Sequence, residues 1–216
     1  MGDDFLMHYA DIKKVDIANG PGVRVSLFVS GCTRRCEGCF NPETWSFEFG
    51  SPFGEAEIER ILSFLDKDHI RGLSLLGGEP FEPANQEAVL ELVERVRDKG
   101  KTIWCYTGYL YEELAAGRVG EHSRALLERL DVLVDGPFVQ EKKNLDLRFR
   151  GSTNQRIIDV PASLQAGEVR LAEEYMNHME YTNPVPRLVL AGRAFFSFLK
   201  KEKNQKTNFL EKLRFS

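Results

Sequence analysis

Long apolar runs, an excess of basic residues and regularly spaced cysteine pairs are all missing from this sequence of 216 residues. No apolar stretch approaches the roughly 20 residues that a membrane-spanning helix needs, and the first nine residues do not resemble a secretion signal. The formal net charge is -4 and the basic residues are dispersed over most of the chain, which argues against direct binding of nucleic acid. We therefore expect a cytoplasmic protein with no membrane span and no direct nucleic-acid partner.

Cysteine is scarce, with four residues in the whole chain, and its distribution is uneven. Cys32, Cys36 and Cys39 fall within one eight-residue stretch, whereas Cys105 lies alone in an apolar run. This distribution is untypical of a disulfide framework. The isolated Cys105 is expected to behave as a small buried apolar residue without a chemical role.

Apolar and β-branched runs alternate with stretches of helical periodicity through the first three quarters of the chain. Residues 58–65 and 89–96 carry apolar side chains at the spacing of one helical face, and another helix is expected around residues 126–130. Short apolar runs ended by glycine, proline or polar residues predict strands. The expected strands are residues 23–29, 73–76, 102–107, 131–135 and 156–160.

Strands separated by helices of this length predict right-handed βαβ units and a parallel sheet, with reactive groups at the carboxyl ends of the strands. Cys32, Gly77, Thr107 and Asp135 all fall at such ends. Four or five units are too few to close an eight-stranded barrel. We therefore expect an α/β fold, an open partial (β/α) barrel of mainly parallel strands, over residues 1–160.

The alternation stops after residue 160, and residues 161–216 are expected to form a helical C-terminal extension of unassigned function. A polar helix is expected from about Gln165 to Met179. The Asn-Pro-Val-Pro sequence at residues 183–186 is typical of a hinge that ends it.

The clustered cysteines have the spacing C-x3-C-x2-C, which allows one short loop to wrap a metal centre. Thiolates suit either zinc or an iron–sulfur cluster. A structural zinc site takes four ligands, and no fourth cysteine or histidine lies nearby in the sequence. A [4Fe-4S] cluster held by three cysteines leaves one iron open for a ligand, so the missing fourth ligand favours the cluster.

The stretch GCTRRCEGCFNPETW at residues 31–45 resembles the signature of the radical S-adenosylmethionine superfamily. The resemblance implies that Cys32, Cys36 and Cys39 ligate a [4Fe-4S] cluster whose open iron binds S-adenosylmethionine. One electron from the reduced cluster would then cleave that cofactor to a 5'-deoxyadenosyl radical. No catalytic residue is expected beyond the cluster and the cofactor.

The resemblance also implies a set of cofactor-binding residues. Gly77-Gly78-Glu79 is similar to the superfamily's GGE motif, which binds the amino end of S-adenosylmethionine. Many members have an aromatic residue before the third cysteine, whereas this chain has Gly38 there and Phe40 just after it. Phe40 is expected to line the cofactor pocket in its place. The expected cofactor-binding residues are Gly38, Phe40, Gly77, Gly78, Glu79, Thr107 and Asp135.

Three longer stretches, residues 15–32, 102–114 and 132–141, resemble the activating proteins of anaerobic ribonucleoside-triphosphate reductases. That resemblance implies abstraction of hydrogen from one glycine of the anaerobic ribonucleotide reductase, which leaves a glycyl radical there. It also implies flavodoxin or ferredoxin as the electron donor. Two alternatives stay open at this point: an activase of another glycyl-radical enzyme such as formate lyase, and a zinc-stabilised protein-interaction module.

Overall fold

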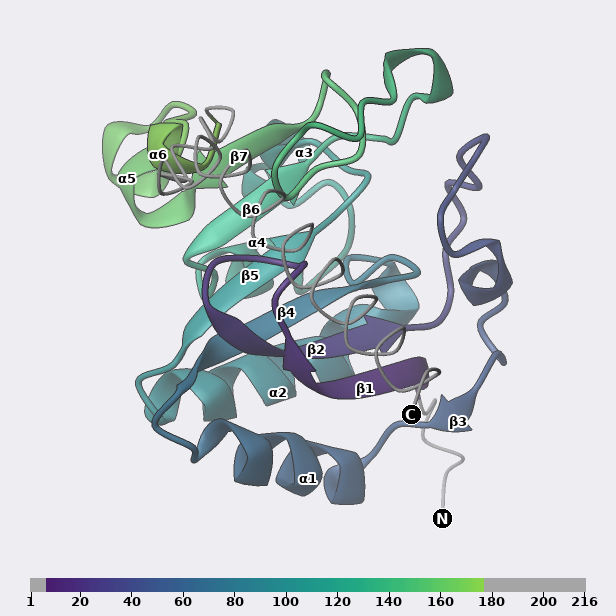
Figure 1. Ribbon diagram of the computed structural model, residues 1–216, viewed down its shortest axis with the longest axis vertical. Helices are drawn as coiled ribbons and strands as arrows, with labels where there is room; N and C mark the ends of the chain where they lie inside the picture. Colours follow the sequence, from purple (N-terminus) through teal and green to yellow (C-terminus); the bar gives the residue numbers. More distant parts are fainter. Residues whose placement is uncertain (1–6, 177–216) are drawn as a thin grey trace, which may run out of the picture. The chain divides into compact units, whose positions relative to one another are not determined.

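The computed structural model of the chain describes residues 7–176, and the rest of the predicted extension lies outside the described residues. Seven strands form one mixed sheet with the spatial order β3-β1-β2-β4-β5-β6-β7 (Figure 1). Strands β2, β4, β5 and β6 run parallel, and β1, β3 and β7 are antiparallel to their neighbours. The strands are β1 (His8–Asp16), β2 (Val23–Val29), β3 (Ser51–Pro52), β4 (Ile70–Gly77), β5 (Thr102–Tyr106), β6 (Val132–Asp135) and β7 (Arg156–Asp159).

All five predicted strands are present, and the α/β class is confirmed. The sheet does not close into a barrel, because its described order begins at β3 and ends at β7. The antiparallel strand β1 was not predicted. Four of its nine residues are exposed and only Ile12 and Asp16 are buried, so the strand lacks the apolar pattern that marks the parallel strands.

Most helices pack on one face of the sheet, and the last, with Tyr175 against Trp104, packs on the other. The helices are α1 (Glu55–Leu65), α2 (Pro83–Asp98), α3 (Tyr111–Ala115), α4 (Ser123–Leu127), α5 (Val160–Ala166) and α6 (Glu173–Met176), together with the 3-10 turns η1 (Pro42–Trp45) and η2 (Gln140–Lys142). Apolar residues of α1 to α4 share one buried cluster with Leu75 of β4 and Cys105 of β5. Because side chains alternate along a strand, Leu76 and Tyr106 point to the opposite face, which these four helices leave free.

The segment after β7 differs from the prediction. Helix α5 begins at Val160, where the Asp159 side chain accepts a hydrogen bond of 2.9 Å from the amide of Ala162. It ends at Ala166, because Gly167 takes a left-handed conformation with φ of 71°. The helix predicted from Gln165 is therefore wrong over the described residues, where α6 begins only at Glu173.

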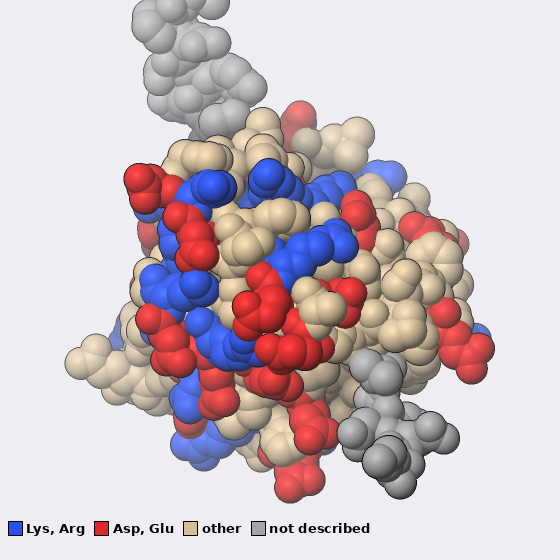
Figure 2. Space-filling model, turned by 90° about the horizontal axis from the view of Figure 1, so that it is seen from below, with Lys and Arg blue, Asp and Glu red and all other residues tan. Residues whose placement is uncertain are grey.

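Charged side chains of both signs are interleaved on the surface shown in Figure 2, which views the molecule from below the orientation of Figure 1. Arg95 of α2 forms ion pairs with Glu55 and Glu59 of α1, the first at 2.8 Å. Lys99 pairs with Asp66 at 2.6 Å. Such exposed pairs contribute little stability individually, but they leave this surface without a large patch of one sign.

None of the helices within residues 7–176 is long and apolar enough to cross a membrane.

Candidate functional site

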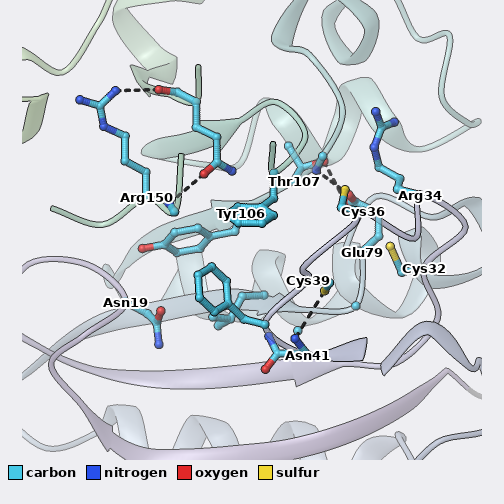
Figure 3. Close-up of a pocket in the computed structure, with 18 of the residues that line it drawn as sticks. Asn19, Cys32, Arg34, Cys36, Cys39, Asn41, Glu79, Tyr106, Thr107 and Arg150 are labelled. Atoms are coloured by element: carbon cyan, nitrogen blue, oxygen red, sulfur yellow. Dashed lines mark hydrogen bonds between the residues drawn. The ribbon is translucent and has the colours of Figure 1, made fainter. Parts of the chain in front are cut away.

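The loops that follow the four parallel strands line a cavity of about 500 Å³ (Figure 3). Its volume lies within the range of small-molecule and cofactor sites. The register explains the convergence, because Val29 at the end of β2 lies opposite Gly77 at the end of β4. Eight of the residues predicted from the sequence line this cavity: Cys32, Cys36, Cys39, Phe40, Gly77, Gly78, Glu79 and Thr107.

The three clustered cysteines are free, half-buried and line the cavity together. Their loop folds back on itself: the amide of Cys32 donates to the carbonyl of Trp45 at 3.2 Å, and the amide of Cys39 donates to that of Cys36 at 3.2 Å. The amide of Asn41 lies 3.4 Å from the Cys39 sulfur and donates to it. Burial raises the pKa of the Cys32 thiol. A bound metal would favour the thiolate form of such a residue.

The geometry of the cysteines bears on the choice between zinc and a cluster. Within residues 7–176, no three His, Cys, Asp or Glu side chains converge tightly enough for a single metal ion. A zinc ion needs its ligands on one point, whereas a cubane is held by thiolates bound to different irons. Cys32, Cys36 and Cys39 share the lining of a cavity that has room for the larger group.

The glycine turn after β4 packs directly against the cysteine loop. The amide of Gly78 donates to the carbonyl of Val29 at 2.7 Å, and the amide of Glu79 donates to the carbonyl of Gly31 at 2.9 Å. A Cβ on Gly78 would lie 2.6 Å from the Gly31 oxygen, which is too close for a backbone atom that cannot move aside. Gly77 has φ of +105°, a conformation that side chains disfavour. Both glycines are therefore required by the local geometry.

Glu79 is buried beside the cavity with its carboxylate hydrogen-bonded on both oxygens. Oε1 accepts from the amide of Phe81 at 3.0 Å and from the hydroxyl of Thr107 at 2.8 Å. Oε2 accepts from the amide of Gly108 at 2.7 Å. Burial, which outweighs these hydrogen bonds, raises the pKa of Glu79 to about 7. A cationic ligand close to this carboxylate would favour its ionised form.

The other predicted cofactor residues lie in different settings. Phe40 lines the cavity but is exposed, with its ring edge-on to Phe138 at 5.1 Å between centroids. Gly38 and Asp135 are not among the lining residues. Asp135 is fully buried and accepts a hydrogen bond from the amide of Tyr111. Its carboxylate also accepts two hydrogen bonds from the guanidinium of Arg156, with which it forms an ion pair. Contact of Gly38 or Asp135 with a cofactor stays a prediction.

Four lining residues outside the predicted site carry buried polar atoms without a hydrogen-bond partner among the described residues. They are Arg34, Trp45, Tyr106 and Arg150. Buried donors left unpaired are costly, and they commonly mark a place where a ligand or water binds. Alternation with the buried Cys105 was a signal for Tyr106, since it places the Tyr106 side chain on the face opposite α1 to α4. Arg150 follows an irregular loop, where no periodic signal exists.

The site and the fold define a class of protein. Three cysteines follow the first parallel strand of an open α/β sheet and line one cavity with a glycine turn. Residues 18–158 match the family described as "4Fe-4S single cluster domain", which covers most of the described sheet. The chain is thus an iron–sulfur protein of the single-cluster class.

Curated relatives define the family more narrowly. The anaerobic ribonucleoside-triphosphate reductase-activating protein of Vibrio cholerae is 45% identical over 155 residues, which span 70% of this chain and 97% of the relative. The protein of the same name from Escherichia coli K12 is 44% identical over 153 residues, 69% of this chain and 96% of the relative. That of phage T4 is 39% identical over 155 residues, 70% and 93% of the two chains. This chain belongs to the family of anaerobic ribonucleoside-triphosphate reductase-activating proteins.

The residues present fit an iron–sulfur cluster with an amino-acid-shaped ligand beside it. The donor set consists of three soft thiols and no fourth cysteine, since Cys105 is fully buried on the helix side of the sheet. Next to the thiols, the Gly77-Gly78 turn exposes backbone to the cavity, and the unpaired donors of Tyr106 and Arg150 line it as well. This combination provides room and hydrogen-bonding groups for a second, polar ligand.

Proposed function

We propose that this chain is an oxidoreductase that installs a glycyl radical on an anaerobic ribonucleotide reductase, using a [4Fe-4S] cluster and S-adenosylmethionine. The observation that carries the proposal is the set of Cys32, Cys36 and Cys39 around one cavity, in a chain of this family. When bound by these residues, the cluster and S-adenosylmethionine would supply the reductive chemistry that removes hydrogen from a glycine Cα of the reductase.

Different residues of the chain are proposed to hold the cluster and the cofactor. Cys32, Cys36 and Cys39 are the proposed ligands of the cluster. The backbone at Gly77 and Gly78 and the carboxylate of Glu79 are proposed to hold the amino end of S-adenosylmethionine, because a buried carboxylate prefers a cationic partner. Thr107 keeps the Glu79 carboxylate in place through its hydroxyl.

The remaining predicted contacts are part of the same proposal. Phe40 is proposed to cover the adenine, since its exposed ring lies at the cavity edge. Gly38 and Asp135 are also proposed to contact the cofactor. We further propose that residues 1–160 form the catalytic domain and that its open sheet curves into a partial barrel around the two groups.

The shape of the site supports a protein substrate. The cavity opens on the face opposite α1 to α4, and the exposed residues Phe40 and Leu145 lie along its lining. A backbone glycine must enter such a site on an extended loop of the partner. We propose the reductase as that partner, flavodoxin or ferredoxin as the electron donor, and the cytoplasm as the location.

The decisive experiment combines the anaerobically reconstituted protein, a reductant, S-adenosylmethionine and the candidate reductase, and records the radical resonance. We expect a glycyl-radical signal that requires all four components, with release of methionine and 5'-deoxyadenosine. A protein that carries iron and cleaves the cofactor but leaves an intact reductase without signal would contradict the choice of partner. Formate lyase in place of the reductase tests the other activase, and a colourless zinc-loaded protein would contradict the chemistry as a whole.

A further inference from the structure

A second buried carboxylate, Glu82, lies three residues after Glu79 at the start of α2. Only 3% of Glu82 is exposed, although a buried carboxylate is unfavourable unless it is paired or hydrogen-bonded. Its Oε1 accepts two hydrogen bonds from one residue, Thr33: the backbone amide at 2.7 Å and the hydroxyl at 2.6 Å. The partner of Glu82 is therefore the cysteine loop itself, at the residue directly after Cys32.

Neighbouring groups of the same turn hold the other side of Cys32. The side-chain amide of Asn85, which is 1% exposed, donates to the carbonyl of Ser30 at 2.9 Å. It also donates to the carbonyl of Glu79 at 3.0 Å, which ties the start of α2 to the glycine turn. Together with Glu82, this contact fixes the backbone on both sides of Cys32.

The next residue of the loop is held from a different element. The guanidinium of Arg34 lies over the ring of Tyr109, 4.6 Å from its centroid, just after β5. By contrast, the described hydrogen bonds of Cys36 and Cys39 are local to the loop, between Cys39 and Cys36 and between Asn41 and Cys39. The Cys32 end of the loop is thus anchored to the core by hydrogen bonds, whereas Phe40, next to Cys39, packs on Phe138.

We propose that Glu82 is a positioning residue that holds the Cys32 end of the cysteine loop in its ligating conformation through Thr33. The inference rests on the proposed cluster for its consequence, but the anchor itself is a property of the protein without metal. A charged acceptor makes stronger hydrogen bonds than a neutral one, so Glu82 limits the motion of Cys32 before and after the cluster binds. Groups that orient a ligand in this way typically change metal affinity by about 10- to 100-fold when they are removed.

The test compares E82A and E82Q with two control variants, E87A and E87Q, which alter an exposed glutamate of the same helix. Each protein is reconstituted anaerobically, and three quantities are measured: iron per chain, the rate of cluster loss to a chelator, and the reduction potential. Hydrogen exchange across residues 30–35 is measured in the metal-free proteins.

We expect E82A to lose its cluster about tenfold faster than the wild type and to exchange faster across residues 30–35. E82Q retains an acceptor for Thr33 but removes a negative charge near the cluster. It should therefore hold the cluster longer than E82A, with a reduction potential more positive than that of the wild type. Both Glu87 variants should match the wild type in every measurement.

A wild-type cluster lifetime and wild-type exchange in folded E82A would overturn the proposal. If E82A does not fold, T33V tests the same contact from the loop, because it removes the hydroxyl donor and keeps the backbone amide. Unchanged cluster loss and exchange in T33V would then overturn it. A wild-type protein that binds no iron would instead contradict the proposed function. Hydrogen exchange in the metal-free proteins would still test whether Glu82 holds the loop at Thr33.

Discussion

The hydroxyl of Thr107 donates a hydrogen bond of 2.8 Å to the carboxylate of Glu79, and this contact joins the ends of the parallel strands β4 and β5. The amide of Gly108 completes the link at 2.7 Å. A single buried carboxylate therefore fastens two of the loops that line the cavity. It also places a carboxyl with a raised pKa next to the glycine turn.

The raised pKa of Glu79 predicts a dependence of stability on pH. An acid whose pKa rises from 4.5 in the unfolded chain to about 7 in the folded protein favours the native state below pH 4.5, and this contribution is lost as the pH rises toward 7. Metal-free E79Q should lack this loss, which amounts to roughly 1.4 kcal/mol per pH unit at most. Urea unfolding of both proteins between pH 5 and 8 measures the difference. Parallel curves for the two proteins would contradict the buried, elevated carboxyl.

The cysteines should separate cleanly into three ligands and one packing residue. Replacing Cys32, Cys36 or Cys39 by alanine should abolish retention of the about four irons expected for the cluster, with little change in fold. C105A should retain the iron and lose about 1 kcal/mol of stability, because Cys105 fills the core between sheet and helices. Iron analysis and thermal unfolding distinguish the two outcomes. Loss of iron in C105A would require a revised ligand set.

Gly78→Ala should displace the cysteine loop. The added Cβ would meet the Gly31 oxygen at 2.6 Å and the Thr44 oxygen at 3.0 Å, so the loop must move. We expect a loss of about 1–3 kcal/mol in stability together with a clear drop in iron retention. Gly117→Ala is the matched control: nothing lies within 4 Å of its added Cβ, and its φ of +65° brings only backbone strain. It should lose some stability and keep its iron.

Arg24 should contribute strongly to stability from the interior of the sheet. It is 1% exposed and donates to Ser74 Oγ at 2.8 Å, Thr102 Oγ1 at 3.0 Å, and the carbonyls of Leu73 and Thr102 at 2.7 and 2.9 Å. Burial lowers the pKa of its guanidinium to about 10, and it stays charged at neutral pH. R24M leaves buried acceptors unpaired and should cost about 2–4 kcal/mol, whereas R71M, at the exposed position of β4, should change stability by less than about 0.5 kcal/mol. Denaturant unfolding measures both.

The sequence by itself determined the parts of this protein that depend on local chemistry and periodicity. The spacing of Cys32, Cys36 and Cys39, the glycine turn at Gly77, and the apolar runs of the five predicted strands each lie within a short segment. Their chemistry and their strand or helix period can be read without knowing the fold. These features were enough to predict the α/β class and to place the loops at one edge of the sheet.

The tertiary structure alone decided how distant residues meet. Glu82 and Thr33 are 49 residues apart, and their contact depends on how α2 packs against the loop after β2. The exposed strand β1 and the buried donor of Arg150 likewise had no periodic pattern to reveal them. A contact of this kind depends on strand register and loop packing, which many distant residues set together. No short segment of the chain encodes it.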